Sequence, residues 1–193
     1  MKFFSGSGAI VASFDLDYDE ALITNAIKNW KKIPIGGCQP DGCGMCGSKP
    51  CVVQKGVISY EPDVDFLEKA KLTNLKKNFQ KCCDRYTEKV NLNKVVITNS
   101  WFNILYPGSE VLFHNHLAGS RVLSGTYYFK VGKGSSPLII QNKESNLKLH
   151  PYNGRCIIFP AWMTHGVKVN KSLERGNISF NTDYREENND RKI

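Results

Sequence analysis

The hydrophobic pattern of this chain changes after Asn91, and the change limits the folds that the second half can adopt. From residue 95 onward, short runs of β-branched and aromatic residues alternate with Gly, Asn and Pro. This pattern is typical of short strands joined by turns, and a series of such strands predicts a β-barrel or a β-sandwich. The expected strands are Val95–Thr98, Trp101–Tyr106, Glu110–His116, Ser120–Val131, Leu138–Asn142, Leu147–Leu149, Gly154–Pro160, Gly166–Asn170 and Asn177–Asp183.

The first 93 residues combine helical periods with an irregular loop. Apolar residues at spacings of three and four predict amphipathic helices over residues 18–32 and 63–89, the second capped by Asp63 or Asp65. Residues 52–60 predict a short hairpin around Lys55-Gly56. We therefore expect a helical elaboration at residues 1–93 with a Cys-rich loop at 38–51, packed on a β core at 94–183, and a frayed tail at 184–193.

Composition narrows the classes of protein to consider. No window approaches the roughly 18 consecutive apolar residues of a membrane span, and the first residues lack a long apolar stretch, so we expect neither a membrane partner nor a signal peptide. The net charge of +8 comes without a dense Lys/Arg run, which favours a solvated helix face over a nucleic-acid surface. We expect a cytoplasmic protein, in the host cytoplasm if a phage encodes it. The sequence does not indicate its oligomeric state.

Three of the four histidines have the spacing of metal ligands. His114 and His116 flank Asn115 on an expected strand, where side chains two apart share a face. His165 follows 49 residues later, after an apolar run that fits a neighbouring strand. Neutral imidazole binds Fe, Zn, Cu and Ni. An H-x-H pair alone is more often structural, but the distal histidine favours a metal site. His150, in a loop before Pro151, is expected outside it.

Arg175 lies ten residues after His165, near the start of the last expected strand. A guanidinium there can hold a carboxylate through two parallel hydrogen bonds. The structural alternative makes Arg175 an ion-pair partner of Glu174 or Glu187.

These motifs, in this order, resemble the Fe(II)/2-oxoglutarate dioxygenases of the prolyl-hydroxylase type, and most closely a branch from bacteria and their phages that also has H-x-H and S-G-x-Y-Y. The resemblance covers roughly residues 95–183. It implies a mainly β fold with flanking helices, a double-stranded β-helix of the jelly-roll or cupin-like kind, with Fe(II) at His114, His116 and His165. The matching segments are Ser100–Ile104, His114–His116, Leu123–Phe129, Gly154–His165 and Arg175–Asn181.

The resemblance also implies a 2-oxoglutarate pocket. Arg175 matches the basic residue that pairs with the far carboxylate of 2-oxoglutarate, and Tyr128 matches a tyrosine that donates to the same group. Ser124 and Tyr127 are expected to line the same strand. Two positions depart from the broader family. His116 replaces the usual carboxylate ligand, which leaves the site one charge more positive, and Asn177 replaces a hydroxyl residue.

A second metal site is expected in the N-terminal half. Cys38, Cys43, Cys46 and Cys51 lie within fourteen residues, and four thiolates can enclose one tetrahedral zinc. An iron–sulfur cluster needs the same number of ligands, two disulfides are the oxidised alternative, and free thiols are the simplest one. The odd total of seven cysteines argues against a fully oxidised framework. We favour structural zinc that staples this Gly-rich loop.

The leading functional hypothesis is an Fe(II)- and 2-oxoglutarate-dependent oxygenase that hydroxylates a C–H bond of an unidentified substrate. The alternatives are a non-catalytic metal- or ligand-binding β-helix module, such as a phage structural protein, and a zinc-dependent activity at the three histidines. Arg175 and Tyr128 favour the oxygenase, because a scaffold has no need of a carboxylate clamp.

We predict that protein purified under reducing conditions contains zinc at the cysteine cluster and that Cys43→Ser loses it. Removing one of four thiolates opens the tetrahedral shell, so metal binding and local folding should be lost together. Elemental analysis of the two proteins measures the difference. Equal zinc content in both would contradict the assignment, and S–S bonds found by mass spectrometry would establish the disulfide alternative.

Overall fold

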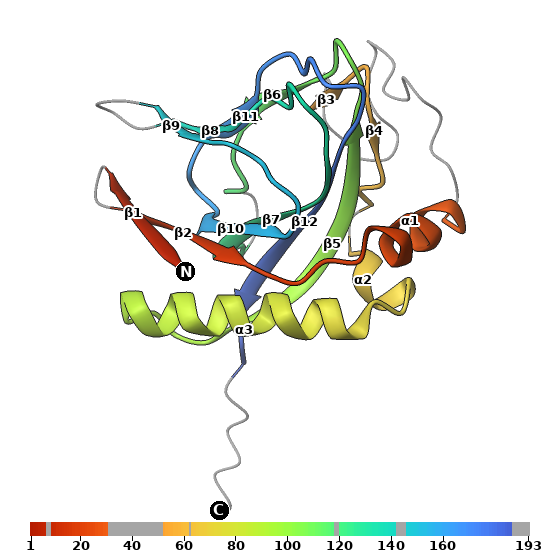
Figure 1. Ribbon diagram of the computed structural model, residues 1–193. Coiled ribbons are helices and arrows are strands. Elements are labelled where there is room, and N and C mark those ends of the chain that lie inside the picture. Colours follow the sequence, from red (N-terminus) through yellow and green to blue (C-terminus); the bar gives the residue numbers. More distant parts are fainter. Residues whose placement is uncertain (7–8, 31–51, 62, 118–119, 142–145, 187–193) are drawn as a thin grey trace, which may run out of the picture.

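Two antiparallel β-sheets face each other (Figure 1). The computed structural model describes residues 1–6, 9–30, 52–61, 63–117, 120–141 and 146–186. The larger sheet has the order β1-β2-β10-β7-β12-β5-β4, and the smaller has the order β3-β6-β11-β8-β9. A mainly β fold with flanking helices is therefore confirmed.

The strands of the larger sheet are β1 (Lys2–Gly6), β2 (Ala9–Asp15), β4 (Val57–Ile58), β5 (Val95–Leu105), β7 (Leu123–Val131), β10 (Arg155–Pro160) and β12 (Arg175–Tyr184). Those of the smaller sheet are β3 (Val53–Gln54), β6 (Glu110–His114), β8 (Leu138–Ile140), β9 (Leu147–Leu149) and β11 (His165–Val167). The two strands expected at residues 95–106 are one strand, β5, because residues 99 and 100 continue the pairing with β12. Four strands come from the first 93 residues and pair within both sheets, and the proposed domain division at residue 93 stays a prediction.

The expected hairpin at residues 52–60 is wrong. β3 pairs with β6 in the smaller sheet, whereas β4 pairs with β5 in the larger one. Lys55 adopts a positive φ of 54°, and Gly56 follows it between the two strands. A Cβ at Gly56 would lie 2.9 Å from the backbone oxygen of Ile104, so glycine permits this close crossing. The segment therefore joins the two sheets.

The helix expected over residues 63–89 is divided into α2 (Phe66–Lys69) and α3 (Thr73–Val90). Lys71 interrupts it with a left-handed φ of 56°, a conformation that ends a helix. Asp65 caps α2 by accepting a hydrogen bond from the Glu68 N–H. The first helix, α1 (Glu20–Lys28), begins after its N-cap Asp19. None of the helices in the described segments is long and apolar enough to cross a membrane.

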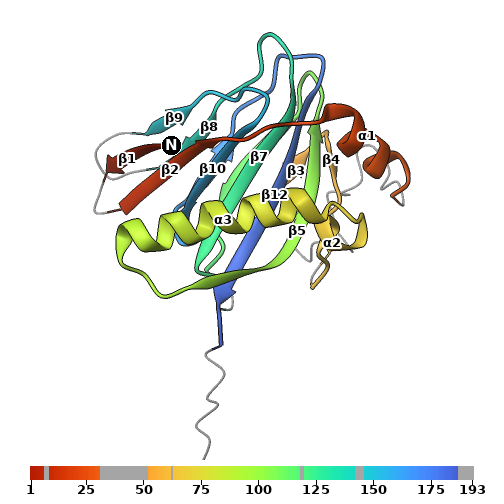
Figure 2. The same cartoon turned by 60° about the horizontal axis from the view of Figure 1, so that its bottom comes forward.

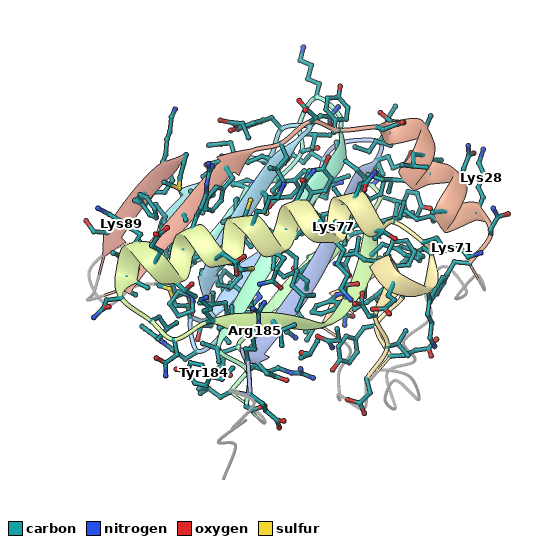
Figure 3. All side chains as sticks on the ribbon, turned by 90° about the horizontal axis from the view of Figure 1, so that it is seen from below. Lys28, Lys71, Lys77, Lys89, Tyr184 and Arg185 are labelled. Carbon is teal, nitrogen blue, oxygen red and sulfur yellow. The ribbon has the colours of Figure 1, made fainter. Side chains whose placement is uncertain are left out.

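α3 lies across the outer face of the larger sheet (Figure 2). Its Phe79 is fully buried and contacts the rings of Tyr127 and Phe180, with centroids 5.1 Å apart in both pairs. The opposite face of the helix is exposed, and Lys71, Lys77 and Lys89 lie on this underside of the molecule (Figure 3). α3 thus covers one face of the larger sheet, and the other face is left to line the space between the sheets.

Gly125 should be essential for the packing of the larger sheet. A Cβ added there would lie 2.0 Å from Phe180 Cζ, and the buried Phe180 ring is stacked against Phe79, which restricts its movement. Gly125→Ala should therefore lower the free energy of unfolding by about 1–3 kcal/mol, as measured by chemical denaturation. Gly132→Ala is the matched control, because its Cβ would make only ordinary contacts at 3.5 Å. Equal stability of the two variants would contradict this packing.

Candidate functional site

A cavity of about 360 Å³ lies between the two sheets. The larger sheet contributes mostly polar side chains from β5, β7 and β12, and the smaller sheet contributes the apolar Val53, Val111, Leu138 and Val167. His114, His116, His165 and Arg175 all line this one cavity.

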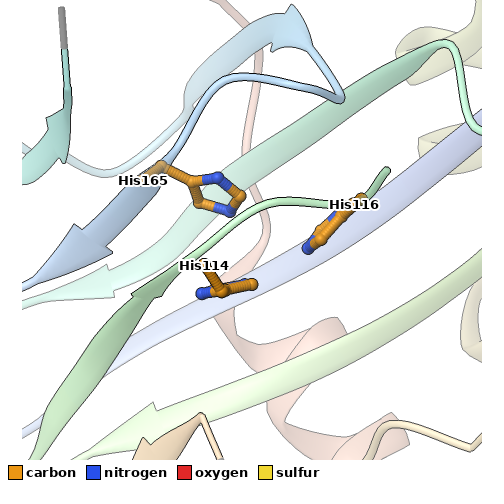
Figure 4. Close-up of side chains that lie close together, drawn as sticks. All are labelled: His114, His116 and His165. Atoms are coloured by element: carbon orange, nitrogen blue, oxygen red, sulfur yellow. The ribbon is translucent and has the colours of Figure 1, made fainter. Parts of the chain in front are cut away.

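The three expected histidines converge (Figure 4). One ring nitrogen from each of His114, His116 and His165 lies within 4.8 Å of the others. His114 ends β6 and His165 begins β11, and the two residues are direct cross-strand partners. β6 stops at His114, so His116 is not on the strand as expected. Its backbone N–H instead donates to the Ala161 carbonyl at 2.9 Å, which holds it beside the segment that leads to β11.

Hydrogen bonds at Nδ1 orient all three imidazoles. His114 Nδ1 lies 2.7 Å from the Leu112 carbonyl oxygen, and His165 Nδ1 lies 2.9 Å from the Met163 carbonyl oxygen. A carbonyl oxygen only accepts, so Nδ1 carries the proton and the lone pair is on Nε2. Binding partners of this kind at the remote nitrogen are typical of histidines that ligate metals.

The three imidazoles are neutral at neutral pH. Burial lowers the pKa of His116 to about 4, with a further contribution from the neighbouring His114. Burial also lowers the pKa of His114, against an opposing hydrogen bond to Leu112. The pKa of His165 falls well below its ordinary value because of burial and then its two histidine neighbours. Neutral imidazole is the form that ligates a metal ion.

Arg175 is a buried cation without an anion. Only 2% of its surface is exposed, and no carboxylate of the described residues lies within ion-pairing distance. Glu174, the expected alternative partner, pairs with Lys130 at 2.8 Å, and Glu187 lies outside the described residues. Burial lowers the pKa of Arg175, opposed by Tyr128, but a guanidinium remains charged in proteins.

Neutral groups accept hydrogen bonds from only some of the N–H donors of the Arg175 guanidinium. Its terminal nitrogens donate to Asn177 Oδ1 at 3.2 Å and to the Tyr128 hydroxyl at 3.3 Å, and the group lies over the Tyr128 ring. Nε has no hydrogen-bond partner. An orphaned donor on a buried cation is energetically costly, so this end of the cavity fits an anionic ligand.

The other expected pocket residues have mixed outcomes. Tyr128 lines the cavity, and Ser124 lines it beside His116 rather than Arg175. Tyr127 was wrongly expected there, because alternation along β7 turns its ring to the other face, against Phe79. His150 is exposed and outside the histidine cluster. Cys38, Cys43, Cys46 and Cys51 lie outside the described residues.

Ser179 and Asn181 on β12 were missed by the sequence analysis as cavity residues, whereas Asn177 was noted there as a departure from the family pattern. Asn177, Ser179 and Asn181 line the cavity with Arg175, whereas the intervening Ile178 and Phe180 pack toward α3. Asn177 donates to Thr126 Oγ1 at 3.1 Å and to Ser179 Oγ at 3.0 Å, and so extends the polar network around Arg175. The alternation of polar and apolar residues from 175 to 181 was the signal that could have identified this set.

Comparison with known proteins identifies the fold. No family model and no curated sequence matches this chain. A 2OG-Fe(II) oxygenase family oxidoreductase from Burkholderia pseudomallei matches with a TM-score of 0.64 and 10% identity, over 90% of this chain and 84% of that one. A prolyl-4-hydroxylase from Pseudomonas putida matches with a TM-score of 0.58 and 12% identity, over 91% of this chain and 93% of that one. A prolyl hydroxylase from Trichoplax adhaerens matches with a TM-score of 0.60 and 12% identity, over 90% of this chain and 83% of that one.

The chain has the double-stranded β-helix fold of these oxygenases. Identities of 10–12% establish a shared fold only, and they carry no residue-level assignment. The expected fold class is thus confirmed. The histidine cluster of this chain stands on its own geometry.

We predict that His114→Ala and His165→Ala each abolish binding of a divalent ion, while His150→Ala retains it. Each of the first two changes removes one of three converging ligands, and His150 lies outside the cluster. Metal content after dialysis against a fixed Fe(II) or Zn(II) concentration measures the effect. Equal metal content in all three variants would contradict the assignment of the metal centre.

Proposed function

We propose that this protein is an Fe(II)- and 2-oxoglutarate-dependent oxygenase that hydroxylates a C–H bond of its substrate. The observation that carries the proposal is the buried Arg175 guanidinium, which has no acidic partner among the described residues and lies in the same cavity as three converging histidines. Metal ligation alone accounts for the histidines, whereas an anionic ligand also accounts for Arg175.

The histidines fit a divalent metal that retains open coordination positions. Three protein ligands on one side of an ion leave room for further ligands from solution. All three imidazoles are neutral, so the protein offsets none of the charge of the metal. Anionic ligands such as the carboxylate of a 2-oxo acid are therefore favoured. When bound, iron and 2-oxoglutarate supply the oxidising chemistry, in which O2 and the 2-oxo acid are consumed to give succinate, CO2 and a hydroxylated product.

Arg175 and Tyr128 fit the far carboxylate of a dicarboxylic acid. The free Nε–H of Arg175 and its terminal N–H groups can donate to carboxylate oxygens, and the Tyr128 hydroxyl lies beside them. The Arg175 site and the histidine site share one cavity, so a short ligand with an anionic group at each end is the complementary shape.

The protein itself orients the reactants and limits access of water. Asn177 accepts from Arg175 and fixes the direction of the guanidinium, and the Nδ1 hydrogen bonds fix the imidazoles. Val111, Leu138 and Val167 form an apolar wall that strengthens electrostatic interactions within the cavity. Residues preorganised in this way position the reacting groups, while the cofactors provide the chemistry.

Two alternatives make different use of the same residues. A zinc-dependent activity is favoured by the ligand set, because three histidines with an open position also describe a catalytic zinc site. A non-catalytic metal-binding module accounts for the histidines as well. Neither alternative gives a role to a cavity-lining guanidinium that has no acidic partner among the described residues, and the oxygenase does.

Arg175→Ala should weaken 2-oxoglutarate binding roughly 100-fold, because charge-assisted hydrogen bonds to the carboxylate are lost. Bound metal should remain, since Arg175 is not among the metal-ligating residues. Arg175→Lys should restore affinity only in part, because an ammonium lacks the planar fork. Titration of 2-oxoglutarate into the anaerobic Fe(II) protein, followed by the visible absorption of the chelate, measures each affinity.

Arg155→Lys is the matched control for this experiment. Arg155 is also buried, but it donates to Ser13 Oγ and the His150 carbonyl and does not line the cavity. The Arg155→Lys variant should therefore bind 2-oxoglutarate with the same affinity as the wild-type protein. Absence of binding to wild-type protein at millimolar 2-oxoglutarate would refute the oxygenase and favour the metal-binding module. Succinate release in air, with candidate substrates, then tests turnover.

A further inference from the structure

His116 is held differently from the other two histidines of the cluster. His114 and His165 each bond through Nδ1 to a carbonyl two residues earlier in their own chain segment. Among the described residues, the His116 ring has no such backbone partner. Its Nδ1 lies 2.7 Å from Asn181 Oδ1 on β12 and 2.8 Å from Ser124 Oγ on β7. The third histidine is therefore oriented entirely by side chains of the opposite sheet.

We propose that Asn181, supported by Ser124, is the positioning residue that directs Nε2 of His116 toward the metal. The inference rests on the metal centre of the proposed function and does not depend on 2-oxoglutarate or on turnover. In this proposal the Asn181 side chain accepts the Nδ1 hydrogen bond of His116, whereas backbone carbonyls accept that of His114 and His165.

The hydrogen bonds determine which nitrogen of His116 carries the proton. Ser124 Oγ lies 2.8 Å from Asn181 Oδ1 and donates its hydroxyl hydrogen there. An unprotonated Nδ1 only 2.7 Å from the same amide oxygen would place two lone pairs against each other. Nδ1 is therefore the donor, and the lone pair of Nε2 is free for a metal ion.

Burial makes this arrangement rigid. Asn181 and Ser124 are 3% and 2% exposed, so bulk solvent has little access to their hydrogen bonds with Nδ1. Without the amide oxygen, only the Ser124 hydroxyl remains near His116 Nδ1. A hydroxyl can donate as well as accept, so it no longer fixes the tautomer or the direction of the ring. A rotated or Nε2-protonated ring presents no lone pair to the metal.

An amide also differs from a carboxylate at this position. Asn181 accepts the proton of His116 without adding charge, so the third ligand stays a neutral imidazole. Aspartate would accept the same proton and add a negative charge, which makes the imidazole a stronger ligand, as in carboxylate–histidine–metal triads. Substitution by alanine and by aspartate should therefore act in opposite directions, which a purely structural role of Asn181 does not predict.

Titration of Co(II), followed by its visible absorption or by competition with a chromophoric chelator, tests the proposal. Asn181→Ala should weaken Co(II) binding about 10–100-fold, and Asn181→Asp should bind at least as tightly as wild type. The control is Asn99→Ala. Asn99 lies directly across from Asn181 on β5 and is fully buried, but its side chain makes no hydrogen bond, so its loss should leave affinity unchanged.

The tautomer gives an independent readout. In zinc-loaded wild-type and Asn181→Asp protein, ¹⁵N NMR of the histidine rings should show His116 protonated at Nδ1, with Nε2 bound to the metal. Co(II) affinity of Asn181→Ala equal to that of wild type, or weakened binding by Asn181→Asp, would overturn the role of Asn181 and leave the proposed function intact. Failure of the wild-type protein to bind Co(II) would overturn the metal centre and this inference together.

Discussion

The alternation of side chains along β12 is the constraint on which both the core and the site depend. β12 lies between β7 and β5 in the larger sheet, so both of its edges are paired and its register is fixed on each side. Ile178 and Phe180 pack under α3, while Arg175, Asn177 and Asn181 face the cavity. A shift of one residue would exchange the two sets and place polar groups against Phe79. Packing of the apolar face therefore holds the functional face in register.

The cavity concentrates positive charge that the protein does not neutralise. Arg175 is buried among neutral partners, and the histidines add no negative charge when a metal ion binds. Burying an unpaired cation is unfavourable, and proteins retain such a cost mainly at functional sites. In the proposed function, one anionic ligand neutralises both positive charges. It would form hydrogen bonds with Arg175 and coordinate the metal ion.

A third imidazole demands more of the fold than a carboxylate ligand would. A carboxylate can ligate through either oxygen, whereas a neutral imidazole ligates through only one nitrogen, and only if the other holds the proton. His116 lies beyond the end of β6, so no backbone carbonyl of its own strand holds the ring. Asn181 and Ser124 approach Nδ1 of His116 from the opposite sheet, so the histidine cluster is built from both sheets.

The sequence by itself determined the class of fold and most of the site, because strand periods and ligand spacings are local patterns. It predicted the strands after residue 95, the convergence of His114 and His165, and an Arg175 side chain that points into the interior of the β core. Only the tertiary structure decided which strands pair, and this depends on contacts between distant segments. Pairing divides residues 52–60 between the sheets and brings Asn181 to His116 across 65 residues of sequence. The same structure places the Tyr127 ring in the core between α3 and the larger sheet and Tyr128 in the cavity, because adjacent residues of a strand point to opposite faces.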